Sequence, residues 1–253
     1  MGIVNVTPDS FSDGGQFYKP EEAIRRARNL VADGAEIIDL GGESTRPGSV
    51  PLSWQDEWAR LEPVLKGLST DGALLSVDTY HPETAERAIG FGVRIINCVF
   101  ADPVVEMARI CAKTGVELVF PFRLKGSVAL SSVGAAGCST GGSCLAGELL
   151  DKVTSVLSVE KLYLDPMIGF GTTREEDVEL LRSVPELAKR GRVLVGASRK
   201  RLVKKLTGEK MTGKNLGGNL GIAVWSAMMG ASVVRVHDVK ETYQALMVVD
   251  ALA

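Results

Sequence analysis

The sequence predicts an α/β protein built as a single (β/α)8 barrel, the TIM barrel fold. Eight short runs dominated by Val, Ile and Leu recur along the chain, and a segment with helical periodicity follows each of them. Strands that are apolar at nearly every position are typical of parallel sheets covered on both faces. The chain has 253 residues, a length that α/β barrels commonly reach undivided, so we expect one domain over 1–253.

The elements alternate in a regular order. Strands are expected at 2–6, 35–41, 73–79, 93–99, 116–122, 161–166, 192–198 and 232–238, and helices at 20–34, 54–68, 82–92, 103–115, 146–158, 173–191, 218–230 and 240–252. Pro20 in a first helical turn and Gly34 after a last one are usual start and stop signals. A doubly wound open sheet is the alternative, but eight evenly spaced units favour a closed barrel. Residues 126–144, rich in Gly and Ser, predict a loop after the fifth strand.

The composition argues against several classes of protein. A formal net charge of −2 does not suit a general binder of nucleic acid or of membrane surfaces. No apolar run approaches the roughly 18 residues of a membrane span, and the first residues lack the features of a signal peptide. The four cysteines form no CxxC pair, so we expect reduced thiols and a cytoplasmic protein.

Function in a closed parallel barrel lies at the C-terminal ends of the strands, here called the rim. Polar and ionisable residues lie at the ends of most of the expected strands or just beyond them. They are Asn5, Thr7 and Asp9 for the first strand, Asp78 for the third, Asn97 for the fourth, Asp165 for the sixth, Ser198, Arg199 and Lys200 for the seventh, and Arg235, His237 and Asp238 for the eighth. Because these groups share one rim, we expect an active site there.

Arg235 and His237 indicate an anion site. They are two residues apart on a strand and therefore point to the same side. With Asn5 and Thr45 they form a set suited to phosphate oxygens, which arginine binds in a bidentate manner. The alternative is a structural ion pair at the rim, for example between Arg235 and Asp238.

Asp78, Asn97 and Asp165 are suited to a heterocycle. A carboxylate accepts two hydrogen bonds side by side and can hold an amino-pyrimidine edge, and an amide offers both a donor and an acceptor. Taken singly, each could instead cap the following helix. Lys200 opens a helix, where positive charge opposes the helix dipole, so its position also indicates a ligand contact.

The motifs at the rim resemble those of the dihydropteroate synthase family of pterin-binding barrels. "GIVNVTPDSFSDGG", "IIDLGGESTRPG", "SVDT", "LDPMIGFG", "GASRK" and "VRVHD" occur in the family's order over nearly the whole chain, and the first two are long and specific. The resemblance implies a transferase that condenses 7,8-dihydropterin-6-ylmethyl diphosphate with 4-aminobenzoate and releases pyrophosphate, in folate synthesis. It also implies a homodimer and a Mg2+ cofactor.

The resemblance assigns roles to most of the rim residues and to residues of the neighbouring loops. It implies that Asp78, Asn97, Asp165 and Lys200 bind the pterin, and that Asn5, Thr45, Arg235 and His237 bind the diphosphate. Magnesium would lie near Asn5 and the loop that follows the first strand. Phe11, Arg46, Pro47 and Ser198 would surround the aminobenzoate, with Phe11 and Asp13 closing over it. The residues expected to take part in catalysis are Asn5, Asp13, Arg235 and His237.

The chemistry of the substrates suggests a mechanism. Diphosphate leaves readily once Mg2+, Arg235 and His237 neutralise its charge. The electron-rich pterin stabilises a cation at its exocyclic methylene, so a dissociative step is expected before the aniline nitrogen attacks. No side-chain nucleophile is required.

The chain departs from the family's usual motifs beside the pterin pocket. Cys98 stands where the family usually has an aspartate, and Phe120, Pro121 and Phe122 replace a Met-His-Met run. "DPMIGFGT" replaces "DPGIGFGK", which introduces Met167 and Thr172. These changes bear on pterin fit and turnover. Two alternatives therefore stand beside the synthase: a pterin-binding paralogue without synthase activity, and a methyltetrahydrofolate:corrinoid methyltransferase, which needs neither the diphosphate set nor the "STRPG" loop.

Overall fold

Eight parallel strands in sequence order form the centre of the molecule. The structure is a computed structural model and describes residues 1–7, 19–43, 50–69, 71–123 and 147–252. The strands are β1 (Gly2–Asn5), β2 (Ile37–Gly41), β3 (Leu74–Asp78), β4 (Ile95–Asn97), β5 (Glu117–Pro121), β6 (Leu162–Asp165), β7 (Arg192–Val195) and β8 (Val233–Val234). Each pairs in parallel with the next, from β1 to β8. The predicted order of strands is confirmed.

The first strand and the segment after the last one close the sheet into a barrel. Gly2 pairs in parallel with Val236. The N–H of Ile3 donates to the carbonyl of Val236 over 3.1 Å, and the N–H of Val236 donates to the carbonyl of Met1 over 3.0 Å. A closed barrel, rather than an open doubly wound sheet, is therefore the architecture of this chain.

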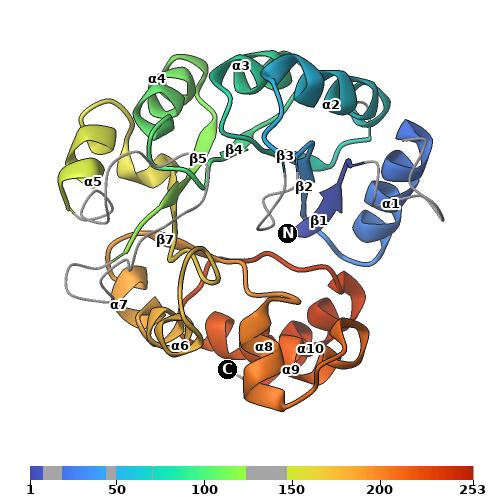
Figure 1. Ribbon diagram of the computed structural model, residues 1–253, viewed down its shortest axis with the longest axis vertical. Helices are drawn as coiled ribbons and strands as arrows, with labels where there is room; N and C mark the ends of the chain where they lie inside the picture. Colours follow the sequence, from blue (N-terminus) through green and yellow to red (C-terminus); the bar gives the residue numbers. More distant parts are fainter. Residues whose placement is uncertain (8–18, 44–49, 70, 124–146, 253) are drawn as a thin grey trace.

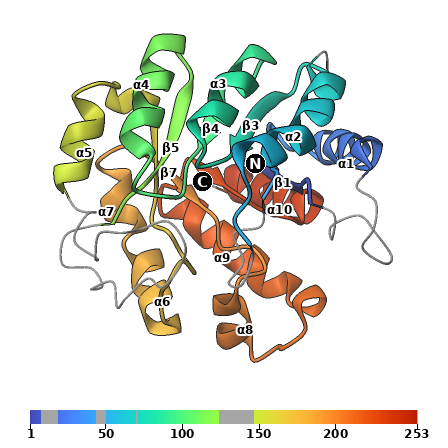
Figure 2. The same cartoon turned by 45° about the horizontal axis from the view of Figure 1, so that its top comes forward.

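The helices surround the strands (Figure 1). They are α1 (Pro20–Ala32), α2 (Trp54–Leu68), α3 (Pro82–Gly90), α4 (Val104–Thr114), α5 (Gly147–Thr154), α6 (Arg174–Arg182), α7 (Val184–Ala188), α8 (Arg201–Thr207), α9 (Leu216–Met228) and α10 (Val239–Leu252). Helices α1 to α5 pack successively against one another, as do α6, α8, α9 and α10 (Figure 2). Their apolar faces and the outer faces of the strands make up the main core.

The structure differs from the expected helices in two places. The helix expected at 173–191 is divided into α6 and α7 after Ser183, because Pro185 lies in the first turn of α7 and cannot continue the preceding ladder. Between β7 and α9 lies an additional short helix, α8, which ends at Gly208 with a φ of 73°. Neither difference alters the order of the strands.

A second, smaller apolar cluster fills the interior of the barrel. It consists of Ile37, Ile95, Val119, Tyr163 and Leu194, with Met1, Leu74 and Val233 packed against it. These residues come from the seven strands β2 to β8 and from Met1, which directly precedes β1. Side chains two residues further along a strand face the same side, so the next inward-facing positions lie above this cluster, toward the rim.

Candidate active site

The predicted site residues occupy those inward-facing positions. Asn97 lies two residues after Ile95, Asp165 two after Tyr163, and Arg235 two after Val233. The register places Asn5 opposite Gly41, Gly41 opposite Asp78, and Asp78 opposite Asn97. The alternation of strand side chains thus brings residues far apart in the sequence to one level inside the mouth of the barrel.

Asp39 in β2 is the centre of the polar network below the rim, although it was not among the residues predicted from the sequence. Its side chain is fully buried. One carboxylate oxygen accepts from the hydroxyl of Ser76 over 2.5 Å, and the other accepts from Nδ2 of Asn97 over 3.1 Å and from Nε of Arg235 over 2.6 Å. A charged residue within an otherwise apolar parallel strand was the signal that could have revealed it.

Arg235 bridges two carboxylates. Besides its bond to Asp39, its Nη2 donates to Oδ2 of Asp78 over 2.8 Å. A structural ion pair, the alternative, is therefore present, but with Asp39 and Asp78; Asp238 binds Arg199 over 2.5 Å instead. Burial raises the pKa of Asp78, and the charge of Arg235 opposes this shift. Arg235 therefore acts as counter-ion to a buried acidic pair in this structure.

Asn97 presents a buried acceptor. Because its Nδ2 donates to Asp39, its Oδ1 is the remaining polar atom, and this oxygen is buried without a hydrogen-bond partner in the described part of the chain. Leaving such an acceptor unsatisfied costs about 1–3 kcal/mol. An N–H donor of a bound ligand would satisfy it.

Asp165 and Lys200 come together with the segment after β6. Oδ1 of Asp165 accepts from the backbone N–H of Met167 over 2.7 Å, and Nζ of Lys200 donates to the carbonyl of Ile168 over 2.5 Å. Nζ also lies 4.4 Å from the centre of the Phe170 ring. Burial raises the pKa of Asp165 and lowers that of Lys200 to about 8, while the attraction between the two opposes both shifts.

None of the three strand-end residues caps a helix. The helices that follow them begin after His81, Pro103 and Thr173, and Thr173 forms a capping box with Glu176. The capping alternative is therefore wrong for Asp78, Asn97 and Asp165. Their side chains are directed into the barrel network instead, where a ligand can reach them.

Ser198 and His237 form a hydrogen-bonded pair beside this network. The backbone N–H of His237 donates to Oγ of Ser198 over 3.2 Å, and Oγ lies 3.1 Å from Nδ1 of the same imidazole. Burial, followed by the charge of Arg199, lowers the pKa of His237 to about 4. We assign the Ser198 hydroxyl as the donor to an unprotonated Nδ1. The neutral ring then carries its proton on Nε2, which is free to act as a hydrogen-bond donor.

Several predicted site residues lie outside the described residues. They are Phe11, Asp13, Thr45, Arg46 and Pro47. Of the other diphosphate residues, Asn5 lies at the end of β1, with its amide oxygen close to Gly41. Within the described residues no group of three or more His, Cys, Asp or Glu side chains is arranged to hold a metal ion.

Of the residues that depart from the family motifs, Cys98, Phe120 and Phe122 belong to the main core outside the strands and not to the interior of the barrel. Cys98 is buried, and burial raises the pKa of its thiol to about 12, so it stays protonated. Phe120 and Phe122 are buried, with ring centres 6.0 Å apart. Met167 has a φ of 65°, a left-handed conformation that costs a non-glycine residue about 1–2 kcal/mol. Thr172 donates to Oδ1 of Asp177 over 2.5 Å.

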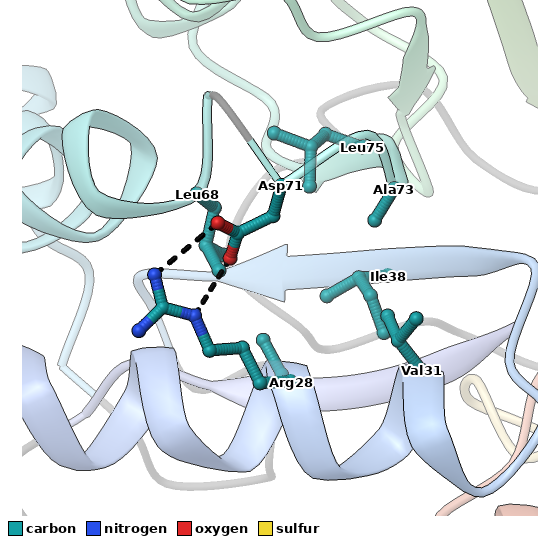
Figure 3. A pocket seen from close by; sticks show the side chains of 8 residues that line it. Arg28, Val31, Ile38, Leu68, Asp71, Ala73 and Leu75 are labelled. Atoms are coloured by element: carbon teal, nitrogen blue, oxygen red, sulfur yellow. Dashed lines mark hydrogen bonds and ion pairs between the residues drawn. The ribbon is translucent and has the colours of Figure 1, made fainter.

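A cavity of about 270 Å³ lies away from the rim, between α1, α2 and the strands beneath them (Figure 3). Apolar side chains such as Val31, Ile38 and Leu75 line it, and the ion pair of Arg28 with Asp71 crosses its edge over 2.7 Å. It contains none of the rim residues. We therefore do not connect it with the site.

Glu57 in α2 is a buried carboxylate next to the rim. Its side chain is fully buried, and its Oε2 accepts from Oγ1 of Thr79 over 2.7 Å. Burial raises its pKa from 4.5 to about 7, and the bond from Thr79 opposes the shift. The folded state therefore binds more protons than the unfolded state between these two values.

Stability should fall as pH rises through this interval. The contribution of Glu57 is fully present below about pH 4.5, is lost as pH rises through about 7, and amounts to roughly 3 kcal/mol. In Glu57→Gln, the unfolding free energy measured in urea from pH 4.5 to 8 should decline less than in the wild type. Identical slopes for the two proteins would show that Glu57 does not titrate in this range. Comparison with the wild type accounts for Asp78 and Asp165, which titrate in both proteins.

Comparisons with known proteins agree with this arrangement. A family model described as "Pterin binding enzyme" matches residues 1–237. The dihydropteroate synthase of Neisseria meningitidis serogroup B is 37% identical, over 100% of this chain and 92% of the relative. That of Mycobacterium leprae is 36% identical, over 99% of this chain and 92% of the relative.

Solved structures of dihydropteroate synthases are also similar to this chain. Dihydropteroate synthase from Clostridium difficile, in the presence of pteroic acid, superimposes with a TM-score of 0.85 at 35% identity, covering 99% of this chain and 95% of that one. The Xanthomonas albilineans enzyme with 4-aminobenzoic acid gives a TM-score of 0.84 at 34% identity, covering 99% and 91%. The similarity therefore extends over the barrel as a whole.

Proposed function

The chain belongs to the pterin-binding enzymes, and within them to the dihydropteroate synthases, and on that premise we propose how its rim residues carry the reaction. The enzyme is a transferase that joins 7,8-dihydropterin-6-ylmethyl diphosphate to 4-aminobenzoate. The observation that carries our assignment of roles is the convergence of two carboxylates, an amide and an ammonium group inside one mouth of the barrel.

The pterin binds among Asp78, Asn97, Asp165 and Lys200. The free Oδ1 of Asn97 accepts from a ring N–H, the carboxylates accept from the amino-pyrimidine edge, and Nζ of Lys200 donates to a ring acceptor. All four groups are wholly or largely buried, so each hydrogen bond forms in a region of low dielectric constant. Fixed donors and acceptors of this kind select a heterocycle by its pattern of polar atoms.

The diphosphate binds beside the pterin, to Asn5, Thr45, Arg235 and His237. Because His237 is neutral, it binds the anion as an N–H donor, and Arg235 supplies the positive charge. To reach the diphosphate, Arg235 gives up part of its contact with Asp78, which turns to the pterin. Arg235 thereby couples binding in the diphosphate subsite to binding in the pterin subsite.

Magnesium suits the donor type available at the end of β1. The amide oxygen of Asn5 is a hard ligand, and Mg2+ commonly uses one or two protein oxygens together with substrate phosphates. When bound there, the ion neutralises charge on the departing diphosphate. Asp13, which lies outside the described residues, is expected to belong to the same catalytic set.

The aminobenzoate binds next to Ser198, together with Phe11, Arg46 and Pro47. The hydroxyl of Ser198 is held by His237, which fixes its position beside the diphosphate. Pyrophosphate leaves first as the C–O bond breaks, and the aniline nitrogen then attacks the methylene cation and releases one proton to water. Within the described residues, Cys98 and Cys111 are buried and protonated, so neither thiol supplies a nucleophile.

The assay that tests this function is pyrophosphate release from the purified protein. We expect release to require the pterin diphosphate, 4-aminobenzoate and Mg2+, to stop with EDTA, and to resume when Mg2+ is added back. Release without 4-aminobenzoate would indicate simple hydrolysis. Calorimetric binding of a pterin with no release under any of these conditions would indicate a pterin-binding protein without synthase activity.

The enzyme forms a homodimer through the outer faces of α9 and α10. These helices lie side by side (Figure 1) and expose a series of large apolar side chains, Met228, Tyr243, Met247, Val248 and Leu252. Tyr243 and Met247 are one turn apart on α10, as are Val248 and Leu252. Exposed apolar surface of this kind marks an association surface.

Light scattering after gel filtration tests the dimer. The wild type should have a mass twice that of its 27.0 kDa chain. The double variant Met247→Glu/Val248→Glu should have the mass of a monomer. Val50→Glu, which alters an exposed valine elsewhere on the surface, is the control and should stay dimeric. A wild type with the mass of one chain would contradict the proposal.

The protein acts in the cytoplasm. Cys98 and Cys111, the cysteines within the described residues, are free thiols, which a reducing compartment preserves. Among the described helices none is both long and apolar enough to cross a membrane.

A further inference from the structure

Arg123 is a buried arginine whose hydrogen bonds go to backbone carbonyls. It lies two residues after the end of β5, and its side chain is 4% exposed. Its guanidinium donates to the carbonyls of Pro166 over 3.3 Å, of Met167 over 3.1 Å and of Phe170 over 3.1 Å. All three acceptors belong to residues 166–170, the Met167 loop, which follows β6. One side chain thus holds this loop at three points.

The Met167 loop contains a strained residue. Met167 has a φ of 65°, where residues with a Cβ atom are rarely found. Its N–H donates to Oδ1 of Asp165, and its carbonyl accepts from Arg123 and from the N–H of Phe170. The left-handed conformation is therefore held on one side by Asp165 and on the other by Arg123. A conformation of this kind persists only when its surroundings determine it.

The same loop holds Lys200. Nζ of Lys200 donates to the carbonyl of Ile168 and lies against the ring of Phe170. Gly169 permits this approach, since an added Cβ atom would lie 3.0 Å from Cδ of Lys200. Asp165 and Lys200 both form hydrogen bonds with this loop, so their positions both depend on its conformation.

We propose that Arg123 is a positioning residue, which holds the Met167 loop in the conformation that places Asp165 and Lys200 for pterin binding. Arg123 acts through the loop and need not contact the substrate. The inference rests on the proposed function, because the pterin role of those two residues belongs to it. The planar fork of arginine suits several acceptors at once, whereas lysine directs its donors from a single nitrogen atom.

Four variants test the proposal: Arg123→Lys, Met167→Gly, the two combined, and Arg182→Gln as a control at an exposed arginine. Calorimetry with a dihydropterin that lacks the diphosphate measures affinity, and thermal unfolding measures stability. Arg123→Lys should weaken pterin affinity about tenfold, and the KM for 4-aminobenzoate should stay at the wild-type value. Arg182→Gln should match the wild type in all three measurements.

Met167→Gly gives the readout that a purely structural role would not produce. Glycine adopts a φ of 65° without a Cβ penalty, so the loop needs less support in its presence. In the glycine background, Arg123→Lys should therefore weaken pterin affinity by roughly threefold or less, as a double-mutant cycle would measure.

Two results would overturn the inference. One is a lower melting temperature in Arg123→Lys with unchanged pterin affinity, which would show that Arg123 only stabilises the fold. The other is the same loss of affinity with Gly as with Met at position 167, which would show that Arg123 does not act through the loop. Failure of the wild type to bind the pterin would instead overturn the proposed function, and this inference with it.

Discussion

Replacing Arg235 by alanine should lower the rate of pyrophosphate release by about 100- to 1,000-fold. Arg235 is a buried cation. If it neutralises the leaving diphosphate, as proposed, its contribution grows as the bond to carbon breaks. Steady-state release of pyrophosphate, measured with saturating 4-aminobenzoate, gives this rate. Near-normal turnover would contradict the leaving-group role.

The structure makes a second measurement necessary for this variant. Because Arg235 also binds Asp39 and Asp78, its removal leaves two carboxylates without their counter-ion. A titration with a pterin that lacks the diphosphate separates the two effects. A loss in turnover much larger than the loss in affinity indicates a role in the departure of diphosphate. Equal losses would show that Arg235 acts by maintaining Asp78 in the pterin subsite.

Replacing Asp39 by alanine should lower the free energy of unfolding by about 3–5 kcal/mol, the usual cost of removing one partner of a buried ion pair. The change leaves Ser76 and Asn97 without their acceptor and removes one of the two carboxylates that Arg235 binds. Denaturant unfolding measures the effect. A loss below about 1 kcal/mol would mean that Arg235 finds a sufficient partner in Asp78 alone.

Asp71→Asn is the matched control for Asp39. Asp71 also binds an arginine over 2.7 Å, but this pair lies at the surface, where water and salt screen it (Figure 3). Its replacement should leave the unfolding midpoint nearly unchanged. A large effect at Asp71 would show that the two sites do not differ in the way their burial predicts.

Much of the fold followed from patterns that are local in the sequence. The strands are apolar at nearly every position because both of their faces are covered. The helices are amphipathic because one of their faces is exposed to solvent. The break between α6 and α7 was missed because the apolar periodicity continues across Ser183, although Pro185 was the available signal.

The candidate residues on the described strands were also predictable, but their partners were not. Side chains alternate along a strand, so Asp78, Asn97 and Asp165 face inward regardless of which groups they contact. A barrel then brings the ends of its strands together. Which side chain Arg235 would meet depended on the relative positions of β2, β3 and β8. Asp238, its neighbour in sequence, pairs with Arg199, whereas Asp39 and Asp78 lie 196 and 157 residues away.

Periodicity and neighbours along the chain were enough to predict the order of the strands, the closed barrel and the inward-facing Asp78, Asn97 and Asp165. The central place of Asp39 in the polar network, the neutral state of His237 and the contact of Arg123 with the Met167 loop could not be predicted, because they arise only in the folded barrel. Each of these depends on burial and on distances between separate strands. A buried charge is stabilised by whichever polar group lies within hydrogen-bond reach, and that reach exists only after the barrel has closed.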